Sequence, residues 1–390
     1  MNESPKPPHP SSPLLDHWPE TLPASWYVDA DWHAREIELI WTKQWLHAGR
    51  VEDFKPGTMR RLDLFGENIV VVRDRGGRLA AFHNVCRHRG SELCQTDEKP
   101  LAGRLIVCPY HQWSYELDGR LVRTPHVLET PDFDKKDHGL FPVHSHEWNG
   151  FVFLCLADEP PPFESAPDLG VGALDNWPMA DLVVGHRLVK ELSCNWKIFW
   201  ENYNECLHCP GIHPELCDMV PVYRRAIMAE NEAVGWTPDA PLPASNLKQG
   251  ARSWSLNGQA CGPEFPRLTD AQRAAGYHFV TLYPTMFIVA HVDYVRAVTL
   301  TPLGPESTRL EAVWLFPRET MVAPGFDLAN VVDFASLVLG QDGDACEMNQ
   351  RGLRSSKFEA GRLAPQEFDI HRFHHWVRAR MGAAMQGGKP

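Results

Sequence analysis

The sequence lacks an excess of basic side chains. Its 390 residues include 38 lysines and arginines against 50 aspartates and glutamates, which gives a formal net charge of −12. Nucleic-acid binding needs a basic surface that neutralises phosphates, so this charge argues against DNA or RNA as a partner. An acidic chain can still attract a cationic substrate or a basic protein.

Long apolar runs are also missing. No uninterrupted stretch approaches the length that crosses a bilayer, so we expect no membrane-spanning helix. The first thirteen residues are rich in proline and serine and have no apolar centre, unlike a secretory signal peptide. We therefore expect a cytoplasmic protein whose ten cysteines serve as metal ligands or buried thiols rather than disulfides.

A β domain is expected in the first half of the chain. From residue 46 to about residue 156, short alternating or apolar segments are separated by turn residues, a pattern typical of β-strands. Three consecutive prolines at 160–162 interrupt this pattern and mark the end of the domain. The β domain is thus predicted at 46–162, which leaves 163–390 for a second domain.

The second domain is predicted to be of the α+β class. Segments with strand character follow one another and indicate an antiparallel sheet, and long periodic segments indicate helices that flank it. The expected strands are 182–193, 277–283, 286–292, 294–302 and 309–316, and the expected helices are 195–209, 327–353 and 368–380.

Two further segments precede these domains. Residues 1–24 contain seven prolines and little apolar periodicity, which predicts a flexible head. Residues 25–45 place apolar side chains such as Ile37 and Trp41 at helical spacing. We expect an amphipathic helix there, with Asp31 as its N-cap, that packs on the second domain.

Two cysteines and two histidines stand in the β domain in the order Cys86, His88, Cys108 and His111. Each half of the set is a weak signal, but together the four side chains can fill four metal positions. Such a set can bind zinc, or a Rieske [2Fe–2S] cluster in which the cysteines hold one iron and the histidines the other. Zinc fingers usually place both cysteines first, whereas the alternating order here is that of a Rieske site.

Residues 200–214 hold the densest group of metal-capable side chains. Two interpretations compete: an open iron site that uses two histidines, and a closed zinc site with two cysteines and two histidines. The groups concerned are Glu205, Cys206, His208, Cys209 and His213.

The spacing within this stretch bears on the geometry. On a helix, Glu205 and His208 would share a face, whereas His213 would point well away from His208. Pro210 and Gly211 lie between the two histidines and could break the helix so that His213 returns beside His208. An iron site of this kind needs one further carboxylate.

The run Cys86-Arg-His88-Arg-Gly90, with Cys108-Pro-Tyr-His111-Gln-Trp113 and Asp118-Gly119, closely resembles the Rieske domain of ring-hydroxylating-type non-haem iron oxygenases. The resemblance extends over nearly the whole chain, from about residue 30 to Trp376. One departure is the gap of nineteen residues between His88 and Cys108, which is longer than usual in that family. We place the extra residues in the loop around Gln95 to Ala102.

The resemblance implies ligands for two metal centres. It implies a [2Fe–2S] cluster on the four residues of the β domain, and a mononuclear Fe(II) on His208, His213 and Asp342, with Asp344 as the next candidate. Without the family, the acidic cluster at 340–347 would be read as a solvated helix face. Cys206 and Cys209 are then expected to be packing residues.

The resemblance also implies an electron path between subunits. Glu205 would link His208 to His111 of the partner subunit, since a carboxylate can accept a hydrogen bond from each imidazole. This path implies a homo-oligomer, most simply a homotrimer. No flavin or pyridine-nucleotide motif is present, so electrons should come from a separate NAD(P)H-dependent reductase.

Glutamate at 205 and the run Glu-Asn-Tyr-Asn-Glu-Cys-Leu-His-Cys-Pro are similar to the carnitine, choline and glycine betaine oxygenase branch. That branch implies an oxygenase component that activates O2 and hydroxylates or N-demethylates a small quaternary ammonium or betaine-type substrate. Aromatic faces suit such a cation, and the expected pocket walls are Tyr203, Phe279, Tyr283 and Phe287.

Three alternatives stay open. The same aromatic walls suit a flat ring, so the chain could be a ring-hydroxylating (di)oxygenase acting on an aromatic acid. A Rieske electron carrier without oxygen chemistry would leave 163–390 unexplained. The most distant alternative is a binding protein stapled by zinc.

Overall fold

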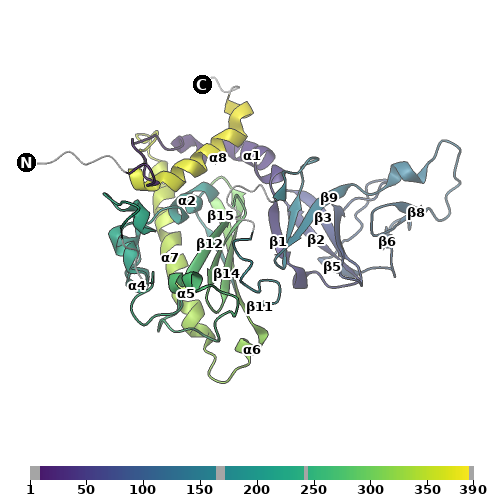
Figure 1. Cartoon of the computed structure of the whole chain (residues 1–390). Coiled ribbons are helices and arrows are strands. Elements are labelled where there is room, and N and C mark those ends of the chain that lie inside the picture. The colour runs from purple at the N-terminus through teal and green to yellow at the C-terminus, as the bar shows by residue number, and fades with distance from the viewer. Residues whose placement is uncertain (1–8, 164–171, 241–244, 386–390) are drawn as a thin grey trace, which may run out of the picture. The chain divides into compact units, whose positions relative to one another are not determined.

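The computed structural model describes residues 9–163, 172–240 and 245–385, and the chain divides into two compact units (Figure 1). The smaller unit is the continuous segment 41–166, and the larger unit combines 1–40 with 167–390. In the part of the chain that the structure describes, no helix is both long and apolar enough to cross a bilayer.

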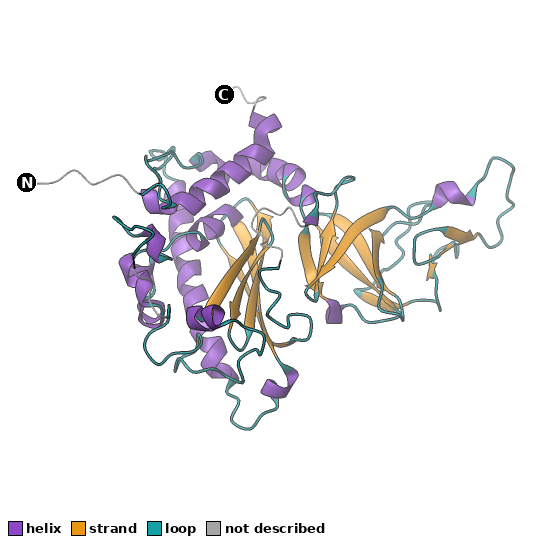
Figure 2. Cartoon of the chain, viewed as in Figure 1, coloured by secondary structure: helices purple, strands orange, loops and turns teal. Residues whose placement is uncertain are grey.

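The smaller unit consists of antiparallel strands in two sheets (Figure 2). The larger sheet has the order β1-β10-β9-β4-β3-β2-β5, and the smaller sheet has the order β6-β7-β8. The strands are β1 (Leu46–Arg50), β2 (Thr58–Leu64), β3 (Glu67–Arg73), β4 (Leu79–His83), β5 (Glu98–Pro100), β6 (Ile106–Val107), β7 (Ser114–Tyr115), β8 (Leu121–Arg123), β9 (Pro142–Trp148) and β10 (Phe151–Cys155).

Strand β3 separates two apolar cores because its side chains alternate between the two faces of the sheet. Val70 and Val72 pack into the cluster that contains Cys86 and Cys108. Ile69 and Val71 point to the other face and pack in a second cluster with residues of β1 and β10. The two predicted cluster cysteines therefore lie in an apolar core.

A glycine fixes the hairpin between β7 and β8. Gly119 has a φ of 89°, in the region that favours glycine. A Cβ at this position would lie 2.6 Å from Cε1 of Phe82, so both the backbone conformation and the packing exclude a side chain. The Asp118-Gly119 turn predicted from the sequence thus packs directly against the ring of Phe82, a core residue.

The larger unit is built on a five-stranded antiparallel sheet of order β11-β15-β14-β13-β12, with helices gathered on one face (Figure 2). The α+β prediction is confirmed, as are the five strands predicted for this domain. They are β11 (Val183–Leu192), β12 (Tyr277–Leu282), β13 (Met286–His291), β14 (Val295–Gly304) and β15 (Ser307–Phe316). Every residue of β13 is buried.

The α-helices of the larger unit include two long ones near the end of the chain, as predicted. The α-helices are α1 (Ala30–Leu39), α2 (Trp196–Tyr203), α3 (Cys209–Ile212), α4 (Pro214–Met219), α5 (Asp270–Ala275), α6 (Arg318–Met321), α7 (Leu328–Leu353) and α8 (Phe368–Met385). Short 3-10 helices are η1 (Ala24–Tyr27), η2 (Trp41–Lys43), η3 (Val51–Asp53), η4 (Lys135–His138), η6 (Pro221–Arg225), η7 (Glu230–Glu232) and η8 (Pro365–Glu367).

The first helix differs from its prediction at both ends. Its N-cap is Asp29, whose side chain accepts the backbone N–H of Trp32 at 2.8 Å, and not Asp31, which lies in the first turn. The helix ends at Leu39 instead of continuing to residue 45. Asp29 precedes the helix and can therefore accept an N–H group of the first turn, whereas Asp31 is already part of that turn.

The prediction of a flexible head is wrong for the later part of residues 1–24. Leu15 N–H donates to the carbonyl of Pro365 at 3.0 Å, and Ala24 N–H donates to the carbonyl of Glu359 at 2.8 Å. The segment therefore pairs with the chain that precedes α8. Residues 1–8 lie outside the described residues.

A buried ion pair joins α1 to α2. Nζ of Lys197 lies 2.6 Å from Oε1 of Glu36, and both side chains are fully buried. The ammonium also donates to the carbonyl of Trp26 and to Oδ1 of Asn195, so all three of its protons have acceptors. This network holds the start of α2, the helix that leads into the stretch around Glu205.

Candidate metal centres

The four predicted cluster residues lie on two loops of the smaller unit. Cys86 and Cys108 are almost fully buried, whereas the rings of His88 and His111 are partly exposed, with their Nδ1 atoms 3.2 Å apart. A backbone hydrogen bond closes each loop. Gly90 N–H donates to the carbonyl of Cys86, and Gln112 N–H donates to the carbonyl of Cys108. The result is a cysteine pair inside and a histidine pair at the surface.

Neighbouring aromatic side chains hold this arrangement in place. The hydroxyl of Tyr115 lies 3.2 Å from Sγ of Cys86 and accepts the N–H of Arg87 at 3.1 Å. The ring of His88 stacks on Trp113, with centroids 4.7 Å apart and an interplanar angle of 9°. Burial raises the pKa of the Cys86 thiol, so a metal must displace a firmly held proton there.

The spacing of the four donors fits a two-iron cluster better than one ion. A tetrahedral zinc site has bonds of about 2.0–2.3 Å, which places its donors less than about 4 Å apart. Among the described residues, three or more donor atoms gather within 4.8 Å only at His208, His213 and Asp342. The cysteine and histidine pairs of the smaller unit are therefore too far apart for a single zinc ion.

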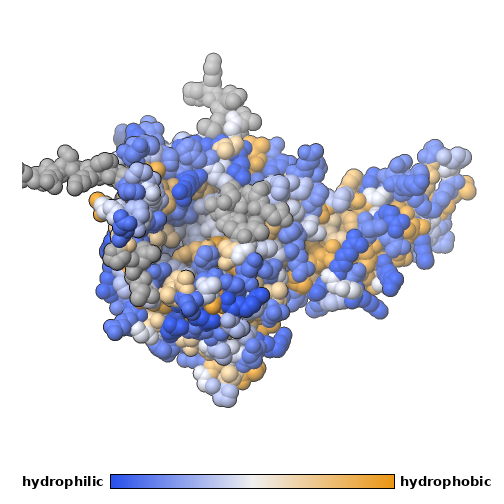
Figure 3. Space-filling view, viewed as in Figure 1, coloured by the Kyte–Doolittle hydropathy of each residue, from blue (hydrophilic) through white to orange (hydrophobic). Residues whose placement is uncertain are grey.

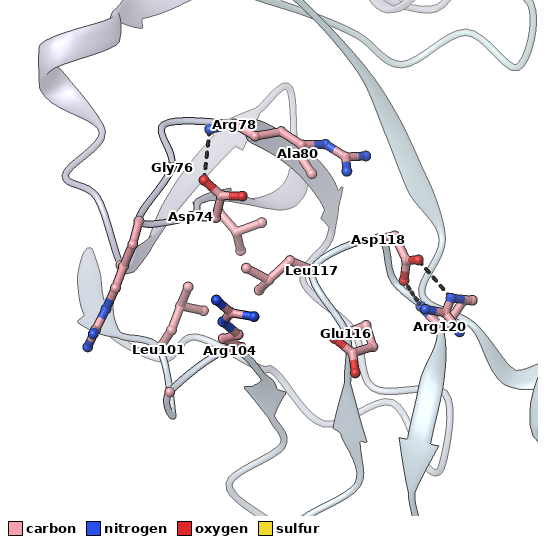
Figure 4. A pocket seen from close by; sticks show the side chains of 14 residues that line it. Asp74, Gly76, Arg78, Ala80, Leu101, Arg104, Glu116, Leu117, Asp118 and Arg120 are labelled. Atoms are coloured by element: carbon pink, nitrogen blue, oxygen red, sulfur yellow. Dashed lines mark hydrogen bonds and ion pairs between the residues drawn. The ribbon is translucent and has the colours of Figure 1, made fainter.

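Another hollow in the smaller unit is lined by charged side chains from three turns, around residues 74–78, 101–104 and 116–120 (Figure 4). Asp74 accepts the N–H of Arg78 at 2.9 Å, and Asp118 accepts from Arg120 at 2.7 Å. Among the described residues that line it, none is a predicted cluster ligand. Two of its three carboxylates, those of Asp74 and Asp118, are thus held by neighbours in their own turns.

The second candidate centre lies in the larger unit, where the stretch from His208 to His213 meets α7. Oδ1 of Asp342 lies 2.9 Å from Nε2 of His213 and 3.5 Å from Nε2 of His208. His208 directly precedes α3, His213 lies between α3 and α4, and Asp342 lies on α7. Two imidazoles and one carboxylate on one side leave other coordination positions open, as in non-haem iron oxygenases.

Each histidine of this trio is oriented by a hydrogen bond at its other nitrogen. Nδ1 of His208 lies 2.5 Å from Oε1 of Glu205, and Nδ1 of His213 lies 2.8 Å from Oε1 of Gln341. Both acceptors take the proton of Nδ1, so the Nε2 atom of each ring, which lies toward Asp342, is the one that can bind a metal ion. Gln341 was not predicted, although it adjoins Asp342 in the sequence.

The trio is strongly coupled electrostatically. Burial alone would lower the pKa of His208, but its hydrogen bonds to Asp342 and Glu205 outweigh burial and raise the pKa to about 9. Burial would raise the pKa of Asp342, yet the hydrogen bonds from the two histidines lower it. The carboxylate is therefore ionised and suited to bind a cation. Asp344, the second candidate, is exposed.

The local backbone differs from the predicted helix over 195–209. Helix α2 ends at Tyr203, and the carboxylate of Glu205 then accepts the N–H groups of Leu207 and His208. Pro210 lies in the first turn of the short helix α3, which begins at Cys209, instead of breaking a longer helix, because proline needs no N–H partner at a helix start. Gly211 does not adopt a left-handed conformation.

The expectation of free thiols is wrong for one pair. Cys206 and Cys209 are joined in a disulfide, and both are buried. Both cysteines still contribute to packing, since they are buried. Because their sulfur atoms are bonded to each other, they cannot bind zinc as thiolates. The other eight cysteines are free.

A cavity opens on the trio and is walled by aromatic rings. Three of the predicted wall residues line it: Tyr203, Phe279 and Phe287. Tyr283 does not line it; its hydroxyl accepts from Asn204 at 2.7 Å while its ring packs against Trp200, Phe373 and Trp376. The cavity is small, with a volume of about 70 Å³.

Several other wall residues were not predicted from the sequence, among them Trp254 and Arg296. Trp254 comes from the long segment between η7 and α5, where no periodic pattern marks it. Arg296 lies on β14. A lone arginine within the apolar run Tyr-Val-Arg-Ala-Val is the one signal that could have identified it.

Comparison with known proteins gives the family. Residues 179–383 match the catalytic domain of the ring hydroxylating alpha subunit, and residues 44–134 match the Rieske [2Fe-2S] domain. The glycine betaine monooxygenase oxygenase subunit of Chromohalobacter salexigens is 30% identical over 95% of this chain and 88% of its own length. The carnitine monooxygenase oxygenase subunit of Acinetobacter baumannii is 28% identical over 88% of each chain.

A solved structure shares the fold. The quaternary ammonium Rieske monooxygenase CntA, in complex with its substrate L-carnitine, has a TM-score of 0.66 and 24% identity, covering 93% of this chain and 96% of its own. Together with the match over both domains, this establishes that the chain belongs to the Rieske non-haem iron oxygenases of the ring-hydroxylating alpha-subunit family, oxidoreductases with a [2Fe–2S] cluster and a mononuclear iron.

Proposed function

We propose that this chain is the oxygenase component of a multicomponent system that oxidises a small N-methylated quaternary ammonium compound. The observation that carries the proposal is the aromatic cavity that opens on His208, His213 and Asp342. A quaternary ammonium has no N–H to donate, so aromatic faces recognise it best. Hydroxylation of one N-methyl group would release formaldehyde.

The aromatic walls are close enough to act as one surface. The rings of Tyr203 and Phe287 lie 4.2 Å apart with an interplanar angle of 31°. Phe279 packs edge-on against Tyr203 at 6.0 Å and against Trp254 at 6.3 Å. A trimethylammonium group is compact, and it suits a small cavity of this composition.

Under this proposal the chain's side chains have assigned tasks. The cluster would be held by Cys86, Cys108, His88 and His111, and the mononuclear iron by His208, His213 and Asp342. The iron, when bound, supplies the site for O2 activation. Glu205 and Gln341 keep the Nδ1 protons of the two histidines in place, and the aromatic walls exclude water from the reacting methyl group.

The proposal includes electron delivery through Glu205. A second hollow also reaches Asn202, Glu205 and His208, which line the aromatic cavity as well. The carboxylate therefore stands in the wall that the aromatic cavity shares with this second hollow. This placement supports a bridge from His208 to His111 of the partner subunit, and hence a homotrimer served by a separate NAD(P)H-dependent reductase.

The exposed end of the cluster site offers a contact surface for such partners. Tyr110 is 61% exposed and lies against the ring of His111, with centroids 3.7 Å apart. Leu128 and Phe141 are further exposed apolar residues of this unit, whose face in Figure 3 shows apolar surface among hydrophilic side chains. Exposed apolar patches commonly mark contact sites.

Hydroxylation of an aromatic acid is the second candidate. The aromatic rings of Tyr203 and Phe287, which are tilted by 31° to each other, could also pack against a flat ring. The naphthalene 1,2-dioxygenase of Rhodococcus shares the fold with a TM-score of 0.64 and 19% identity, over 93% of this chain and 94% of its own.

A substrate screen separates the two candidates. The iron-loaded protein, coupled to a surrogate reductase and NADH, is offered glycine betaine, carnitine, choline and benzoate. We expect O2 uptake matched by formaldehyde release with at least one N-methylated compound, and none with benzoate. Hydroxylated benzoate without formaldehyde from any ammonium compound would refute the proposed function.

A further inference from the structure

A buried arginine lines the cavity without a protein partner. Arg296 lies on β14, paired in register with Val289 of β13 and Trp314 of β15, and it is only 4% exposed. Its Nε and Nη1 atoms are buried and make no hydrogen bond within the described residues. Among those residues no carboxylate forms an ion pair with it.

An unpaired guanidinium in this position is costly. Arginine keeps its proton under all physiological conditions, so it cannot escape burial by becoming neutral. Taking an ion out of water without a counter-ion costs several kcal/mol. By contrast, the buried ammonium of Lys197 in the same unit has Glu36 and two further acceptors. Arg296 lacks such partners, which indicates that its acceptor comes from outside the chain.

The nearby carboxylates are committed elsewhere. Asp342 accepts from both histidines of the trio, and Glu205 accepts from His208 and from backbone N–H groups. Among the described residues that line the cavity, Arg296 is the only arginine or lysine. The cavity therefore presents one unpaired positive group next to aromatic faces.

We infer that Arg296 binds a carboxylate of the substrate, and that the substrates are betaines, which carry a carboxylate and a quaternary ammonium in one molecule. The inference rests on the proposed function and specifies its substrate class. The planar guanidinium matches a carboxylate with two parallel hydrogen bonds. Anchoring that end would leave the methylammonium end to the aromatic walls.

The charge of the cavity favours a zwitterion over a simple cation. A choline-type alcohol would bring a second positive charge toward Arg296 and toward the metal ion, and would leave the guanidinium unpaired. A betaine brings its own counter-ion, and its net charge is zero. Choline and glycine betaine differ in this one group, so they form a matched pair of probes.

The test compares these two compounds on the full-length, iron-loaded protein. The wild-type kcat/KM should favour glycine betaine or carnitine over choline, and Arg296→Met should lower the betaine-to-choline ratio by about 100-fold. Arg296→Lys should keep part of the betaine-to-choline ratio that Arg296→Met loses, because lysine keeps the positive charge but cannot donate two parallel hydrogen bonds. Anaerobic calorimetry should show the same loss in betaine affinity without any turnover.

Arg380→Met is the matched control. Arg380 also belongs to the larger unit, and its buried Nε makes no hydrogen bond to the described residues. It differs from Arg296 in that it packs on Trp376 and does not line the cavity. Its ratio should stay at the wild-type value. A wild-type preference for choline, or an unchanged ratio and affinity in a folded Arg296→Met, would overturn the inference while the proposed function stands. If no ammonium compound is oxidised, the proposed function fails; betaine binding that depends on Arg296 would still support the carboxylate site, and equal binding in both proteins would overturn it.

Discussion

At the scale of single residues, the carboxylate of the iron site gives a direct test. Asp342 contacts both histidines, whereas Asp344, two residues on, is exposed. Asp342→Ala should lower the iron content from about three to about two atoms per chain and leave the visible spectrum of the cluster unchanged. Asp344→Ala is the matched control and should keep all its iron. Metal analysis with an unchanged iron content in Asp342→Ala would contradict the assignment.

Glu205→Gln keeps one acceptor oxygen for Nδ1 of His208, although its amide NH2 replaces the oxygen that accepts the N–H groups of Leu207 and His208. The negative charge is also lost in this variant. Both metal centres should stay loaded, and turnover should fall by about 100-fold. Glu230→Gln, which removes a carboxylate paired with Arg225 on the surface, should behave as wild type. Near-normal turnover of Glu205→Gln in stopped-flow assays would exclude the bridging role.

Sequence patterns were enough to predict the metal donors, but not the residues that orient those donors or complete the site. His208 and His213 stand in a recognisable motif, so their types and spacing suffice. Gln341 acts through a hydrogen bond across 128 residues of sequence, and Arg296 through the absence of a partner among the described residues. Neither property leaves a periodic or compositional trace, because both depend on which side chains the fold brings together.

At the scale of elements, strands were predicted better than helix ends. The apolar runs of β12 to β15 are long enough for their pattern to decide. The end of α2 depends instead on Glu205, whose carboxylate takes N–H groups that a continuing helix would use. Similarly, Asp29 and Asp31 are equally good caps by residue type, and only the backbone geometry selects Asp29.

The contact between α1 and α2 should depend on its buried ion pair. Glu36→Gln leaves Lys197 charged and buried without a counter-ion, which should lower the free energy of unfolding by about 3 to 5 kcal/mol. The double variant Glu36→Leu/Lys197→Met removes both charges and should recover most of that loss. Arg35→Gln, on the exposed side of the same helix, should change little. Chemical unfolding measures all three, and equal stability of Glu36→Gln and wild type would contradict this account.

At the scale of the whole molecule, the two units differ in how the chain builds them. The composition of the sequence suggested breaks near residues 45 and 162, and the compact units divide at 40/41 and 166/167. The larger unit needs the N-terminal segment because Glu36 and the backbone of residues 15–24 complete its packing. That requirement arises from contacts between distant segments, which composition does not reveal.

The smaller unit is one continuous segment with its own sheets and two apolar clusters, so it should fold without the rest of the chain. A fragment of residues 41–166 should bind about two irons and show a Rieske spectrum. Cys86→Ser in the same fragment should abolish that spectrum, since it removes a buried donor. A fragment that is folded by circular dichroism yet binds no cluster would show that cluster binding needs the larger unit, and zinc in place of iron would revive the zinc interpretation of the four residues.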